Sequence, residues 1–139
     1  MFLSLIGSAG AAAPNDNQLT VVVAGGPFAG TYKASGAPIA CARIKSRDLF
    51  GAGWKDFNAK GNELAEVGIE VSNPDGSAPK HGNVHVGFGG GDKMTVYKIF
   101  TKPVSLQSQG RGGVIEFDGK TDDGIRLHVE AICKYVEEF

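Results

Sequence analysis

The chain has 139 residues, of which 42% are apolar and 21 are glycine, and its formal net charge is −1. This length fits one domain better than two. The apolar fraction, and glycines that follow no three-residue period, exclude collagen and wholesale disorder. With 14 basic residues against 15 acidic ones, no overall field recruits nucleic acid. We therefore expect a single domain over residues 14–139, without a nucleic-acid partner.

The first thirteen residues, MFLSLIGSAGAAA, form a short apolar run that passes into small residues. This order is typical of the apolar and cleavage regions of a secretory signal, although no Lys or Arg precedes Lys33. The run is shorter than the ~20 apolar residues that span a bilayer. We expect residues 1–13 to be a signal-like segment, cleaved or retained, and the protein to be secreted or periplasmic with no membrane span.

Two cysteines, Cys41 and Cys133, lie far apart in the chain, and neither belongs to a CxxC motif. No histidine or further cysteine lies close enough in sequence to suggest a zinc site. In an exported chain this pattern predicts a disulfide between them. Two unrelated buried thiols are the alternative.

The first strands are indicated by β-branched runs that turns separate. Residues Gln18–Ala24 and Phe28–Ser35 flank Gly25-Gly26-Pro27, which predicts a hairpin. A third strand is expected over Ile39–Lys45. Residues Asp48–Asn62 contain several Gly and Asn breakers, and we expect a long loop there with at most one short strand.

The clearest strand is Leu64–Val71, where apolar residues occupy one face while Glu66 and Glu70 occupy the other. A turn is expected at residues 73–76. Pro103 should place the residues after it at a sheet edge or in a loop. The other expected strands are Val84–Phe88, Lys93–Thr101, Val114–Phe117 and Ile125–Val136.

Together these patterns predict an all-β fold: an antiparallel β-sandwich, or alternatively a small barrel, of seven to nine short strands with one disulfide. One conflict arises from side-chain alternation. Cys133 falls on the inner row of its strand, whereas an inner row of Ala40, Ala42 and Ile44 would point Cys41 outward. A bulge near Pro38, or a disulfide clipped across a sheet edge, would resolve it.

The histidines and acidic turns are weak metal candidates. His81 and His85, four residues apart on an expected strand, would lie roughly 13 Å apart, too far to share an ion. Residues 118–124 are rich in oxygen ligands, but a hairpin turn explains the same residues. We therefore expect neither a metal nor a cofactor.

Trp54 lies in the glycine-rich segment that we expect to be a loop, where aromatic side chains commonly anchor a partner or a sugar. The alternative is that it plugs the end of the sandwich. Arg43, Lys45 and Arg47 share one parity and would form a basic stripe, which is typical of a charge-guarded sheet edge and can also attract an acidic ligand. These four residues are the predicted ligand or partner contacts.

Catalytic residues are not indicated. The sequence has no GxSxG elbow, and Glu66 and Glu70 would lie too far apart for glycoside hydrolysis, which needs carboxyl groups within about 10 Å. Glu116 and Glu130 are expected to face each other across the last hairpin, without an evident proton donor. We therefore assign no catalytic residue.

The sequence favours a non-catalytic, exported β-sandwich that binds a partner protein, a glycan or a small ligand through its loops. The alternative is a structural subunit of a larger cell-envelope or extracellular assembly. A hydrolase with a scattered site is the third hypothesis, and its hallmark would be a close carboxylate pair inside a deep cleft.

Overall fold

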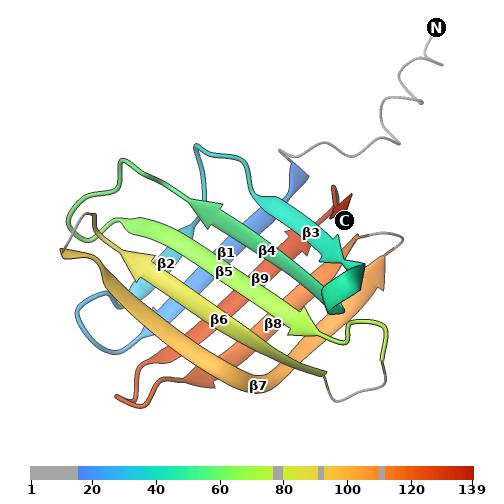
Figure 1. Cartoon of the computed structure of the whole chain (residues 1–139). Helices are drawn as coiled ribbons and strands as arrows, with labels where there is room; N and C mark the ends of the chain where they lie inside the picture. The colour runs from blue at the N-terminus through green and yellow to red at the C-terminus, as the bar shows by residue number, and fades with distance from the viewer. Residues whose placement is uncertain (1–15, 77–79, 91–92, 110–111) are drawn as a thin grey trace, which may run out of the picture.

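The architecture comes from a computed structural model, which describes residues 16–76, 80–90, 93–109 and 112–139. The predicted signal-like segment, residues 1–13, lies outside these ranges. Within them the chain is all-β and forms one curled sheet of ten strands, a half-barrel (Figure 1). The strands are β1 (Gln18–Ala24), β2 (Gly30–Lys33), β3 (Ala40–Ile44), β4 (Leu49–Lys55), β5 (Leu64–Ser72), β6 (Lys80–Phe88), β7 (Thr95–Gln109), β8 (Gly112–Lys120), β9 (Arg126–Cys133) and β10 (Glu137–Glu138).

The strand order is β10-β3-β4-β5-β6-β7-β8-β9-β1-β2. Neighbouring strands are antiparallel except β10, which pairs with β3 in parallel, so the sheet is mixed. The all-β prediction is confirmed. The prediction of seven to nine strands was too low for the described part of the chain, and a purely antiparallel sandwich is not what the structure shows. Over the same residues, no helix is long and apolar enough to span a bilayer.

Strand β7 explains why the sheet curls instead of dividing into two. Its first half pairs with β6, and its second half, from Val104 onward, pairs with β8. The change of partner occurs at a bend where Thr101 has a positive φ of 55° and the β6 register shifts between Gly82 and Val84. Pro103 lies at this bend, where the ladder is already irregular, and the residues after it continue β7 and do not form a loop. In Figure 1, β7 runs under the molecule and joins the front and rear strands.

A seven-residue strand, β4, occupies the first half of the segment 48–62, in which a long loop was expected. Its inward residues, Phe50, Ala52 and Trp54, are buried, whereas Gly51 and Gly53 alternate with them on the outer row. Glycine is usually depleted in strands, so it obscured the period-two signal. The segment therefore contains the one strand that the sequence allowed, at seven residues, and the loop is confined to residues 56–63.

The core fills the space between the two halves of the sheet and contains Phe50, Phe88 and Phe117. The predicted disulfide between Cys41 and Cys133 is confirmed, and it joins β3 to β9 through this core.

The side-chain rows of β3 were assigned the wrong way round. Cys41 is 1% exposed and faces inward, whereas Ala40, Ala42 and Ile44 face outward. Cys41 and Cys133 are therefore both inner-row residues, and the conflict between them disappears. The outward side chains of β3 are small or apolar, and they line a hollow on the outer face of the sheet.

One polar side chain, Asn17, is buried among the described residues and is 4% exposed. Its amide nitrogen donates to the carbonyl oxygens of Ile39 and Tyr135, at 3.0 and 2.9 Å. Its amide oxygen accepts from the backbone N–H groups of Lys134 and Tyr135, at 2.7 and 2.8 Å. Asn17 thus ties the start of β1 to the segment before β3 and the segment after β9.

Four aromatic rings pack at one end of the core. Phe28 stacks on Phe88 with ring centroids 4.5 Å apart, and Tyr32 and Tyr97 meet Phe88 edge-on. Burial, and to a lesser degree the Asp123 carboxylate and Tyr32, raise the pKa of Tyr97 above that of a free tyrosine. This cluster holds the β1–β2 turn against the strands opposite.

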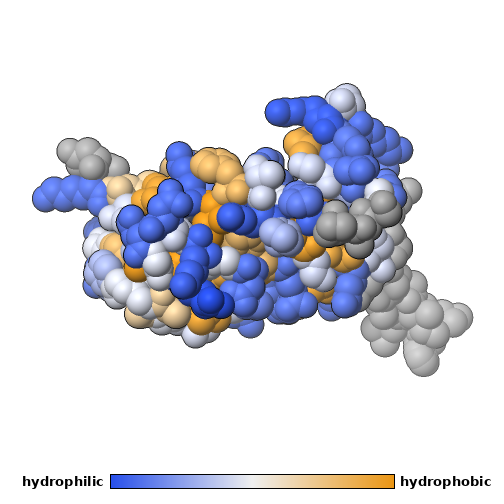
Figure 2. All heavy atoms as spheres, turned by 90° about the horizontal axis from the view of Figure 1, so that it is seen from below, coloured by the Kyte–Doolittle hydropathy of each residue, from blue (hydrophilic) through white to orange (hydrophobic). Residues whose placement is uncertain are grey.

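The surface seen from below, on the side where β7 lies, is mixed in character. Hydrophilic side chains alternate there with smaller hydrophobic patches (Figure 2).

Candidate functional site

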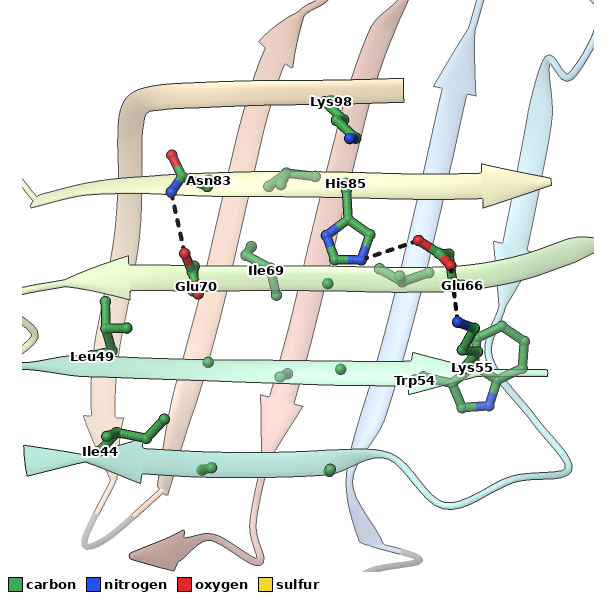
Figure 3. A pocket seen from close by; sticks show the side chains of 18 of the residues that line it. Ile44, Leu49, Trp54, Lys55, Glu66, Ile69, Glu70, Asn83, His85 and Lys98 are labelled. Carbon is green, nitrogen blue, oxygen red and sulfur yellow. Dashed lines mark hydrogen bonds and ion pairs between the residues drawn. The ribbon is translucent and has the colours of Figure 1, made fainter. Parts of the chain in front are cut away.

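A hollow with a volume of about 870 Å³ lies on the outer face of β3 to β7. We call it the trough (Figure 3). Its floor consists of residues with little or no side chain: Ala40 and Ala42 on β3, Gly51 and Gly53 on β4, and Gly68 on β5. Longer side chains from β4 to β7 stand around this floor.

Strand register brings the floor residues together. Ala40 pairs with Gly53, which pairs with Gly68, and Ala42 pairs with Gly51. Because side chains alternate along a strand, these residues all point to the same outer face. The result is a patch without large side chains across β3 and β4, bounded on β5 by the His85 ring over Gly68 and by Glu70. Each row ends on a polar side chain, since Gly68 pairs with His85 and Gly51 pairs with Glu70.

A charged cluster forms one end of the rim. The His85 imidazole lies over Gly68, close enough that a Cβ atom at position 68 would collide with the ring. His85 Nε2 is 3.4 Å from one carboxylate oxygen of Glu66, and Lys55 Nζ is 3.8 Å from the other. Lys98 stands across from His85 on β7. The imidazole is thus oriented by a carboxylate and by the absence of a side chain beneath it.

The other end of the rim is built on Glu70 and Asn83. The Asn83 amide nitrogen donates to a Glu70 carboxylate oxygen at 3.2 Å. The Asn83 amide oxygen accepts from the backbone N–H of Thr101 at 2.8 Å. This pair connects the trough to the bend of β7. Figure 3 shows it on the opposite side of the view from Lys55, Glu66 and His85.

Apolar side chains complete the rim. Ile44 and Leu49 pair with each other where β3 turns into β4, and Phe100 of β7 is 63% exposed at the margin. The trough therefore combines an apolar floor with a mixed rim. Its four charged side chains, two Lys and two Glu, balance one another.

The chemistry available in the trough is limited. His85 can exchange a proton, and Glu66 orients it. None of the described residues that line the trough carries a hydroxyl or thiol group that could act as a nucleophile. Among the described residues, no group of three or more His, Cys, Asp or Glu side chains is arranged to hold a metal ion.

The predicted contact residues do not meet at one place. Trp54 is 7% exposed and packs beneath one end of the trough, and its indole N–H has no hydrogen-bond partner among the described residues. A smaller cleft, of about 470 Å³, adjoins its other side. Its role as a ligand contact stays a prediction.

The three basic residues lie on different elements. Arg43, on β3, places its guanidinium over the Phe50 ring at 4.9 Å and pairs with Asp75 at 3.1 Å. Lys45 and Arg47 belong to a short 3₁₀ helix (Lys45–Arg47) and are exposed. The strand ends at Ile44, so a strand-borne stripe does not continue past Arg43. Whether these side chains contact a partner stays a prediction.

The remaining candidate side chains lie outside the trough. Glu116 and Glu130 face each other in register, as expected, on the outer face of β8 and β9. His128 lies 3.9 Å from Glu116 on the same face. Residues 118–124 belong to the end of β8 and the turn into β9, which Thr121 closes by a hydrogen bond from Ile125 N–H to its hydroxyl at 3.1 Å.

Sequence reasoning missed the trough. Its signal was present as small residues at every second position, at 40 and 42 and again at 51 and 53. The first pair was interpreted as a core row and the second as loop breakers. Only the pairing of β3 with β4 and β5 shows that they form one surface.

Comparisons of the chain with protein-family profiles, with curated proteins and with solved structures give no match.

Proposed function

We propose that the protein is a non-catalytic binding module that holds a segment of a partner protein in the trough. The observation that carries this proposal is the bare floor, on which four residues from two adjacent strands, Ala40, Ala42, Gly51 and Gly53, present no side chain larger than a methyl group. A sheet face that contacts only solvent would not need such a hollow. The sequence had suggested loops as the contact surface, with Trp54 as an anchor. We now place the contact on the sheet face, because Trp54 is nearly buried.

The size and polarity of the trough support this proposal. Its volume of about 870 Å³ falls within the ~300 to 1,000 Å³ that is usual for ligand sites. An apolar centre within a polar rim is also the usual anatomy of a protein interface. The balanced charges of Lys55, Lys98, Glu66 and Glu70 favour neither a polyanion nor a polycation as the ligand.

A protein segment fits the floor better than a glycan. Sugar rings are bound by aromatic faces and by convergent hydrogen-bonding groups. The floor offers only Cα and methyl groups, and the exposed aromatic ring, Phe100, stands at the margin. Apolar side chains of a partner could fill the floor without leaving polar groups unpaired.

The test is to fill the trough and measure binding. A Cβ atom at Gly53 would have only the Val67 carbonyl oxygen within 4 Å, at 3.9 Å, so Gly53→Leu should fill the floor without straining the sheet. The matched control is Ala24→Leu, at an exposed position on β1. Ala40→Leu, also on the floor, is a second blocking variant should Gly53→Leu fold poorly.

Two probes serve for this test: a phage-displayed library of random twelve-residue peptides and a glycan array. We expect peptides selected on the native protein to bind the Ala24→Leu control and to lose at least tenfold in affinity for either blocking variant. Ligands that bind the blocked proteins as well as the native one, or hits confined to the glycan array, would refute the proposal.

We further propose that the protein works outside the reducing cytoplasm, in a secreted or periplasmic location. The Cys41–Cys133 disulfide supports this, because such bonds persist mainly in oxidising compartments. Alkylation of free thiols in protein taken directly from its source cells, followed by mass measurement, should find both cysteines unmodified. Full alkylation of the native, unreduced protein would contradict an exported location.

A further inference from the structure

We infer that the segment held in the trough is an amphipathic α-helix that lies along β4. This inference rests on the proposed function and adds the conformation and direction of the ligand.

Backbone hydrogen bonding decides between a helix and an extended peptide. β3, β4 and β5 pair without interruption along the floor, from Ala40 opposite Gly53 to Gly51 opposite Glu70. Their N–H and C=O groups are therefore already used within the sheet. An extended peptide on this floor would leave its own backbone groups unpaired on the buried side, and each such group would weaken binding. A helix satisfies its backbone groups internally.

The dimensions of the floor also fit a helix. The open floor spans β3 and β4, whose axes lie ~4.8 Å apart, and the His85 ring and Glu70 bound it on β5, so one face of a helix of ~10 to 12 Å diameter can rest on it. The floor and its apolar end extend along β3 from Ala40 to Ile44. At ~3.3 Å per residue this is roughly 13 Å, enough for about nine helical residues or two and a half turns.

The floor also specifies which face the helix presents. Because Gly51 and Gly53 contribute no side chains, the facing helix must supply the volume over them. Large apolar residues at i, i+3 or i+4, and i+7 would do so. Phe100 at the margin is placed to cover the flank of such a helix.

The rim charges favour one direction for the helix. Glu70 lies at one end, while Lys55 and Lys98 lie toward the other, where Glu66 offsets one of the two positive charges. A helix carries partial positive charge at its N-terminus and partial negative charge at its C-terminus. The N-terminus is therefore expected over Glu70, with the C-terminus toward the lysines.

The experiment compares two phage libraries of equal diversity, both selected on the native full-length chain. One displays a helical hairpin with a single randomised helix face, and the other displays a β-hairpin with a single randomised face. We expect the helical library to give binders that Gly53→Leu weakens at least tenfold and that Ala24→Leu leaves unchanged.

Direction is tested with Glu70→Lys. It should weaken these helical binders about two- to fivefold, the size of a helix-dipole interaction. Glu116→Lys, a charge change on the far outer face, is the control and should have no effect. An unchanged or improved affinity with Glu70→Lys would overturn the assigned direction.

Failure of this inference and failure of the proposed function are distinguishable. If only the β-hairpin or linear-peptide library gives binders that depend on Gly53, the helix inference is overturned while the proposed function stands. If no binder from any library depends on Gly53 or Ala40, both are overturned.

Discussion

Three glycines of the trough illustrate how differently one residue type can act. A Cβ atom at Gly51 would lie 2.8 Å from the backbone oxygen of Ile69, which cannot move away. At Gly68 it would meet the His85 ring, which can turn aside because it is the end of a side chain. At Gly53 it would meet almost nothing. Gly51 therefore serves close strand packing, Gly68 makes room for the imidazole, and Gly53 keeps the floor open.

Alanine substitution should separate these three roles by their effect on the free energy of unfolding. Gly51→Ala should lower it by about 2 kcal/mol, since backbone must shift. Gly68→Ala should lower it by less than about 1 kcal/mol, because only the half-exposed His85–Glu66 pair is disturbed. Gly53→Ala should leave it unchanged or raise it by about 0.5 kcal/mol, since alanine restricts the unfolded chain. Urea unfolding provides the measurement, and equal effects at the three positions would contradict this account.

Asn17 shows how much one buried polar side chain can hold together. Asn17→Ala would leave two carbonyl and two N–H groups without their partner, and we expect the free energy of unfolding to fall by about 3 kcal/mol. The exposed neighbouring residue, Gln18, provides the control. Gln18→Ala should change the free energy of unfolding by less than about 0.5 kcal/mol. A loss below about 1 kcal/mol for Asn17→Ala would mean that water replaces the amide.

At the scale of the element, β7 depends on its bend. Thr101 adopts a φ of 55°, which β-branched residues rarely adopt and glycine adopts readily. Thr101→Gly should therefore raise the free energy of unfolding by up to about 1 kcal/mol. Thr95→Gly, at the start of the same strand, should lower it by about 1 kcal/mol, since that position shows no positive φ. Thermal unfolding of the two variants checks this, and a loss of stability in both would show that the bend is not strained.

The accuracy of prediction also varied by element, and the reason is physical. The strand over Leu64–Val71 was predictable because polar residues alternate with apolar ones, and β5 extends it by one residue. β4 was not, because glycine on its outer row gives no polar contrast. The row assignment of β3 failed because its outward residues are apolar and line the trough, which exposes them to solvent only in part. Alternation reveals a strand only where the outer face is polar.

At the scale of the whole molecule, the disulfide links the two halves of the curled sheet. Cys41 and Cys133 are 92 residues apart, and closing so long a loop should stabilise the fold by about 4 to 5 kcal/mol in the chain-entropy model. We expect the Cys41→Ala/Cys133→Ala double variant to lose about this amount in urea unfolding. A loss below about 1 kcal/mol would indicate that the core alone holds the halves together.

The all-β character and the disulfide could be predicted from sequence because alternation and cysteine content are local or compositional signals. The trough could not be predicted from sequence, because its formation depends on which strands are neighbours in the sheet. Ala40, Gly53 and Gly68 become one surface only through the order β3-β4-β5, and the same is true of Glu66 and His85 across β5 and β6. Pairing across the sheet is a property of the whole molecule.

The central claim is that the outer face of β3 to β5 is the binding surface. It is tested most directly by amide chemical shifts of ¹⁵N-labelled protein titrated with the strongest binder selected on the native chain. We predict that the largest shifts occur at Gly51, Gly53 and Gly68. Shifts concentrated on the far outer face, around Glu116 and Glu130, with the three glycines unmoved, would contradict it.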